Sequence, residues 1–117
     1  MEIIISNWWV IILVIVSLIL VKNFSKKSKV DLKKLVEDGA VIVDVRTEAE
    51  YKSGHIEKSI NVPLGDLTYR ISEFNKEDNI ITVCAAGIRA ESAKKYFISK
   101  GYNATNGGKW SNIKDII

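Results

Sequence analysis

The chain contains a single cysteine, Cys84, which is followed after three residues by Gly87 and after five by Arg89. A thiolate is a strong nucleophile, and nearby positive charge or N–H donors help it to form. A loop that turns at a glycine can point several backbone amides inward, and an arginine adds a planar fork of donors suited to an oxyanion. This spacing predicts an anion-binding loop, in which the first anion to be stabilised is the cysteine's own thiolate.

The predicted loop is nearly apolar. We expect its backbone amides to bind the substrate, and its residues are Ala85, Ala86, Gly87, Ile88 and Arg89. Only the arginine has a polar side chain, so the pattern alone leaves the substrate open. The competing interpretation is that Cys84 is a small buried residue of the core, as free cysteines often are. The glycine and the arginine at these spacings favour a site.

Other residues that could carry chemistry are scarce. One cysteine allows no internal disulfide and no second thiol to resolve a mixed disulfide, which disfavours a dithiol oxidoreductase. With one Cys and one His, the chain has no pair of ligands at zinc spacing. We therefore expect neither a metal site nor a cofactor. The single histidine, His55, is a candidate general base because imidazole exchanges a proton near neutral pH.

The length of 117 residues suits one small domain, and its net charge of +3 is mild. Basic residues gather after the first apolar segment instead of alternating with aromatic residues across a fold, so we expect no nucleic-acid binding. Residues 3–21 contain no charged side chain, and as a helix they would be roughly 28 Å long, close to the thickness of a bilayer. We expect residues 1–22 to form a transmembrane anchor rather than a cleaved signal peptide, which needs a basic start and a small-residue cleavage site.

The basic residues predict which way this anchor points. Four of them follow the apolar run, namely Lys22, Lys26, Lys27 and Lys29, whereas the other flank has only Glu2. Because positive residues stay on the cytoplasmic side, we expect a single-pass membrane protein whose folded domain faces the cytoplasm. Residues 23–29 then form a basic linker that could touch membrane lipid, and a membrane protein is a possible partner.

The elements that must position the cysteine follow from the rest of the chain. Helices are predicted over residues 32–36, 48–51, 64–74, about 90–97 and 110–116, and strands over 41–45, 60–62 and 79–83, with a brief strand at 104–105 before a Gly107-Gly108 turn. This alternation predicts an α/β fold with a mainly parallel sheet flanked by helices. Cys84 then lies at the carboxyl end of a strand, where ligands of such sheets bind.

Two groups of motifs resemble a known family. The first comprises Asp44-Val45-Arg46-Thr47-Glu48, Tyr51, Gly54-His55-Ile56 and residues 60–64; the second is the loop at 83–90, and Gly101-Tyr102, Gly107-Gly108 and Trp110 follow in order. Together they are similar to a rhodanese-like domain over residues 30–117. The resemblance implies a five-stranded parallel sheet and transfer of sulfane sulfur through a cysteine persulfide. One departure is a shorter segment before Gly107, so the last strand could be short or irregular.

The resemblance also implies roles for individual residues. Cys84 would be the nucleophile, the loop amides would hold the persulfide, and Arg89 would orient an anionic donor such as thiosulfate. The acceptor would be a thiol or cyanide. Asp44 and Arg46 are expected to support the site structurally. His55 is expected to be a hydrogen-bonded structural residue, because persulfide transfer needs no base once the thiolate has formed.

Two alternatives remain open. Dual-specificity phosphatases have a similar fold, but their arginine lies six positions after the cysteine, whereas Arg89 lies five positions after Cys84. The shorter loop fits a sulfur atom better than a phosphoryl group. The second alternative is a persulfide carrier without turnover, or a docking module for a membrane partner. The intact Cys, Gly and Arg argue against a degenerate binding domain and leave the carrier possible.

Overall fold

The computed structural model describes residues 7–27 and 31–117 of the chain. The chain divides into two units, one through Val30 and one from Asp31 to Ile117. All strands of the described residues belong to the second unit, so the cysteine loop is part of it.

The described residues of the first unit form one helix, α2 (Trp8–Lys27). It begins five residues after the start of the predicted apolar run and extends six residues beyond its end. Among the described residues, no helix combines the length and the apolar character that crossing a membrane requires. The prediction of a transmembrane anchor over residues 1–22 is therefore not supported, and its first six residues lie outside those described. The cytoplasmic orientation and the contacts with lipid or a membrane protein stay predictions.

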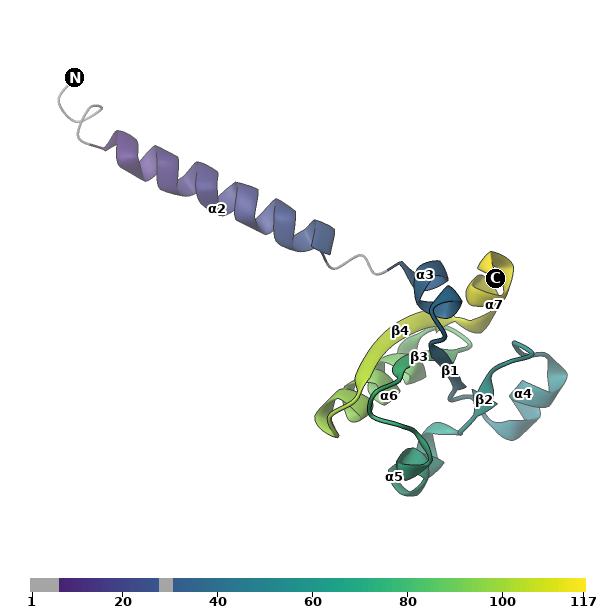
Figure 1. The fold of residues 1–117 in the computed structure, drawn as a ribbon. Coiled ribbons are helices and arrows are strands. Elements are labelled where there is room, and N and C mark those ends of the chain that lie inside the picture. Colours follow the sequence, from purple (N-terminus) through teal and green to yellow (C-terminus); the bar gives the residue numbers. More distant parts are fainter. Residues whose placement is uncertain (1–6, 28–30) are drawn as a thin grey trace. The chain divides into compact units, whose positions relative to one another are not determined.

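The second unit is built on a parallel sheet of four strands in the order β2-β1-β3-β4 (Figure 1). The strands are β1 (Val41–Asp44), β2 (Ile60–Asn61), β3 (Asn79–Cys84) and β4 (Asn103–Lys109). The two central strands are β-branched and almost wholly buried, as strands covered on both faces should be. The prediction of an α/β fold with a parallel sheet is confirmed, but the described residues form four strands and not five.

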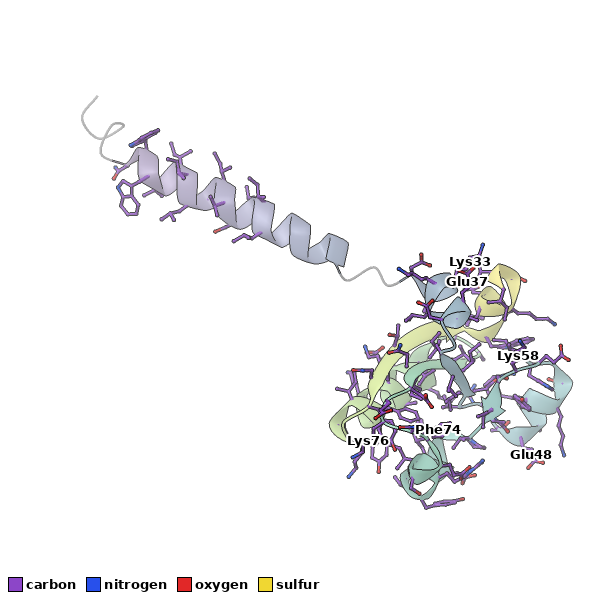
Figure 2. The ribbon with its side chains drawn as sticks, viewed as in Figure 1. Lys33, Glu37, Glu48, Lys58, Phe74 and Lys76 are labelled. Carbon is purple, nitrogen blue, oxygen red and sulfur yellow. The ribbon has the colours of Figure 1, made fainter. Side chains whose placement is uncertain are left out.

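Helices cover both faces of this sheet, and a separate cluster of buried apolar residues lies on each face. On one side α6 (Ile88–Ser99) and α5 (Leu67–Arg70) pack against the strands, with Phe97 and Leu67 fully buried. On the other side α3 (Leu32–Glu37) and α7 (Trp110–Ile116) lie next to each other, as Figure 1 shows. Charged side chains such as Lys33 and Glu37 lie on the outside, whereas Phe74 is buried (Figure 2).

Local sequence signals place the ends of several helices. Asp31 accepts the amide of Lys34 at 3.1 Å and caps α3, and Thr47 with Glu50 forms a capping box at the start of α4 (Glu48–Ser53). The helix predicted over 64–74 is instead three short pieces, namely the 3₁₀ turns η1 (Leu64–Asp66) and η2 (Ile71–Glu73) on either side of α5. Its apolar stripe still faces the core.

The last strand differs most from the prediction. β4 has seven residues, and Gly107 and Gly108 lie within it instead of forming a turn. Its register against β3 shifts between Thr82 and Val83, which leaves Gly107 as an extra residue, or β-bulge. A Cβ on Gly107 would lie 2.7 Å from Cγ2 of Ile81, so only glycine allows this approach. The shorter segment before Gly107 predicted a last strand that is short or irregular. The strand is irregular, but with seven residues it is not short.

Candidate active site

Cys84 is the last residue of β3, at the carboxyl edge of the sheet. Its side chain is 1% exposed, and its sulfur receives two backbone N–H groups, from Gly87 at 2.9 Å and from Ala90 at 3.4 Å. Two donors therefore face the buried sulfur, and N–H donors of this kind stabilise negative charge on the atom that they face. Sequence reasoning expected the amides of residues 85 to 89, and it missed Ala90. Its amide belongs to the first turn of α6, so the strand-loop-helix pattern could have indicated it.

The backbone at Gly87 makes these contacts possible. Gly87 has φ +90°, a left-handed conformation, and it is the residue from which α6 starts. A side chain there would be strained, and its Cβ would lie 3.4 Å from Cα of Gly108. Asn106 of β4 donates to the carbonyl of Gly87 at 3.1 Å and also contacts Glu91 at 2.9 Å. The final strand therefore holds the loop that surrounds the sulfur.

The side chains around the loop are apolar and exposed. Ala85 and Ala86 are exposed, and Ile88 is 77% exposed. Their side chains offer no hydrogen bonds, so polar recognition by this loop falls to the backbone amides and to Arg89.

Arg89 is engaged by a residue that sequence reasoning did not select. Its Nη1 and Nη2 atoms donate to Oε1 and Oε2 of Glu50 at 2.7 and 2.9 Å, which is a bidentate ion pair. The hydrogen bond from Arg89, followed by the amide of Thr47, lowers the pKa of Glu50 from 4.5 to about 2. The same carboxylate raises the pKa of Arg89. In the sequence, Glu50 is only one residue of the helix predicted over 48–51, because its partner lies 39 positions away.

Asp44 and Arg46 form a second ion pair beside the site, and this one is buried. Arg46 donates through Nε and Nη2 to the Asp44 carboxylate at 2.8 to 3.1 Å, and it also donates to the carbonyls of Glu50 and Gly54 at 3.3 and 2.7 Å. Its guanidinium carbon lies 4.6 Å from the ring centre of Trp110. These contacts tie β1 to α4 and α7, and they favour the predicted supporting role.

His55 has contacts of a structural kind. Its Nδ1 donates to the carbonyl of Tyr51 at 2.7 Å, and its ring stacks on the Tyr51 ring with centres 3.8 Å apart. It lines a depression of about 390 Å³ with Lys52, Asn61 and Arg70, among others, and Cys84 is not among the residues that line it. The geometry therefore favours the structural role over that of a base.

The fold and the site define an α/β domain that presents one cysteine sulfur to backbone amides at the carboxyl edge of a parallel sheet. A family model described as rhodanese-like domain matches residues 28–108, well over half of the chain. The chain belongs to this family.

Individual relatives agree with this assignment. The chain is 34% identical over 76 residues to the "Putative sulfur carrier protein YrkF" of Bacillus subtilis (strain 168), which covers 65% of this chain and 39% of YrkF. The structure is similar to a rhodanese with anions from E. coli (28% identity, TM-score 0.60, 63% of this chain and 91% of that one). It is also similar to the human single domain sulfurtransferase TSTD1 (25% identity, TM-score 0.61, 72% of this chain and 89% of that one).

Proposed function

We propose that this protein is a sulfurtransferase in which Cys84 carries sulfane sulfur as a persulfide. The observation that carries the proposal is the pair of N–H groups of Gly87 and Ala90 directed at one sulfur. They stabilise negative charge on that sulfur. A persulfide on Cys84 extends one sulfur atom beyond Sγ, and the two residues that follow Cys84 are exposed.

The reaction has two displacement steps. In the first, the Cys84 thiolate attacks the outer sulfur of thiosulfate, the S–S bond of thiosulfate breaks, and sulfite leaves with the bonding electron pair. In the second, an acceptor thiolate or cyanide attacks the outer sulfur of the persulfide and restores the Cys84 thiolate. Neither step needs an external oxidant or reductant. Neither step needs a second cysteine, which agrees with the single thiol of the chain.

Thiosulfate and cyanide supplied to the full chain test this proposal. We expect thiocyanate to form, and a variant with Cys84→Ser to form none, because serine cannot hold sulfane sulfur. Mass spectrometry of the wild-type chain treated with thiosulfate alone should show one added sulfur atom on the peptide that contains Cys84. If thiocyanate forms equally well with Cys84→Ser, the proposed function is wrong.

A persulfide carrier without turnover is the second candidate, favoured by the similarity to YrkF and by the engagement of Arg89. The same two measurements separate the candidates. A persulfide on Cys84 with no thiocyanate indicates a carrier, whereas a persulfide with sustained thiocyanate release indicates the enzyme.

A further inference from the structure

The only charged side chain of the cysteine loop, Arg89, is neutralised by Glu50. Both terminal nitrogens of the guanidinium bond to one carboxylate in a fork-to-fork arrangement, at 2.7 and 2.9 Å. The carboxylate belongs to α4, and the same atom Oε1 also accepts the amide and hydroxyl of Thr47 at 3.2 and 3.1 Å. Glu50 is thus held from two sides, by the helix start and by the arginine.

This arrangement has an electrostatic consequence for donors. A free arginine beside the sulfur would attract a dianion such as thiosulfate, whereas an ion pair has no net charge and attracts it much less. Because the pKa of Glu50 is held at about 2, the carboxylate stays charged at any pH at which the thiol reacts. The pair is about one-third exposed, so it can be reached by solvent and by a small ligand.

The other side chains of the cysteine loop add no positive charge, and the nearest lysine in the sheet is Lys109, which lies opposite Cys84 on β4. Ala85, Ala86 and Ile88 are apolar and exposed, and the amides that face the sulfur are uncharged. Once Arg89 is paired, no free charged side chain of this loop favours a divalent donor over one with less charge.

We propose that Glu50 is a specificity-determining residue that acts through Arg89 and turns the site away from divalent inorganic donors toward persulfides with at most one negative charge. This inference rests on the proposed function and narrows its donor class. Glu50 does not touch the sulfur, so its effect belongs to donor affinity more than to the displacement step.

The variant Glu50→Gln tests the charge separately from the position. The amide oxygen of glutamine can still accept the Thr47 amide and one Arg89 N–H, so α4 keeps its cap. With the full chain, we expect kcat/KM for thiosulfate to rise roughly three- to ten-fold, mainly through a lower KM, as removal of one negative charge near a dianion predicts. For a donor persulfide without carboxylate or sulfonate groups, kcat/KM should change much less.

Glu48→Gln is the matched control. Glu48 lies on the same turn, at the outer edge of α4, and its side chain is 72% exposed and pairs with Lys52 at 2.9 Å (Figure 2). The substitution Glu48→Gln removes the same charge, but Glu48 does not pair with Arg89. The ratio of kcat/KM for thiosulfate to kcat/KM for the persulfide donor should therefore stay at the wild-type value. A rise equal to that of Glu50→Gln would mean that overall charge is responsible, and this would overturn the inference.

A second measurement uses the wild-type chain and does not depend on any variant. A neutral pair predicts that kcat/KM for thiosulfate does not fall as salt is added, whereas an unpaired arginine predicts a marked fall. A marked fall of kcat/KM with salt would overturn the inference, and so would an unchanged donor ratio in folded Glu50→Gln. In either case the proposed function stands, provided that wild-type Cys84 forms its persulfide. A wild-type chain that forms no persulfide from either donor would overturn both.

Discussion

The amide of Gly87 lies 2.9 Å from the sulfur of Cys84, and the φ of +90° at Gly87 turns the chain from this amide into α6, whose Ala90 amide faces the same sulfur. A residue with a side chain resists this conformation by roughly 1–2 kcal/mol. It also meets the backbone of Gly108, which lies 3.4 Å from the position of its Cβ. The geometry of the sulfur site thus depends on one backbone conformation.

Gly87→Ala is therefore expected to lose most sulfur transfer. Either the alanine keeps the strained conformation and stability falls by about 1–2 kcal/mol, or the loop relaxes and its amide turns away from the sulfur. We expect at least a roughly ten-fold loss of thiocyanate formation, as for removal of a donor that stabilises an anion.

Gly39→Ala is the matched control for this prediction. Gly39 has φ +93°, a Cβ added to it would meet no atom within 4 Å, and it lies before β1, outside the loop. It should show a similar loss of stability with unchanged turnover. If both variants lose turnover equally, the effect of Gly87 is one of stability and not of the site.

The β-bulge in β4 gives a prediction about packing. Gly107→Ala places a Cβ 2.7 Å from Cγ2 of Ile81 and 3.0 Å from Cγ1 of Val83, both fully buried, so the strands must separate. We expect the free energy of unfolding to fall by about 1–3 kcal/mol in urea titrations. Gly65→Ala, where a Cβ meets nothing within 4 Å and φ is not positive, should be neutral or stabilising.

The buried ion pair gives a prediction about charge. In Asp44→Asn, the guanidinium of Arg46 stays buried at 4% exposure but loses its counter-charge. We expect a loss of about 3–5 kcal/mol in the free energy of unfolding, because an uncompensated buried charge is costly. The exposed pair of Glu48 and Lys52 is the comparison, and Glu48→Gln should cost less than about 1 kcal/mol. Equal losses in the two variants would contradict the prediction.

Glu50 predicts a pH dependence with a definite sign. Its pKa is lowered from 4.5 to about 2 in the folded chain, so its ionised form stabilises the fold. That contribution is complete above about pH 4.5 and is lost as the pH falls toward about 2. Other carboxylates with lowered pKa values, Glu73 and Glu91, act in the same direction. The difference in unfolding free energy between wild type and Glu50→Gln isolates Glu50, and it should be constant from neutral pH to about 4.5 and then shrink.

Local features were predicted well because they depend on near neighbours. The helices predicted to begin at residues 32 and 48 do begin there, because the side chains of Asp31 and Thr47 each accept an amide three residues later. The buried strands β1 and β3 follow from β-branched runs, and the position of Cys84 follows from the end of such a run. The continuous helix expected over 64–74 was wrong, because an apolar stripe of that spacing is also compatible with short helical turns in series.

The parallel pairing of the strands was predicted, but several other contacts between distant segments were not. The Gly107-Gly108 pair was interpreted as a turn, since two glycines often form one, and only the register against β3 places them in a strand. The donor amide of Ala90 depends on how α6 starts after Gly87. The membrane anchor rested on the apolar run alone, and the described helix does not support it.

Residue types and spacing were enough to identify the α/β class, the strand end that carries the thiol and the glycine that turns the loop, since each depends on periodicity or backbone preference within a few positions. The charge state of the loop was a different matter. Glu50 and Arg89 are far apart in the chain, and their bidentate contact exists only because α4 and the start of α6 meet beside β1 and β3. Folding alone therefore brings a cancelling charge to the arginine beside the sulfur, because Coulomb interactions follow distance in space and not separation along the sequence.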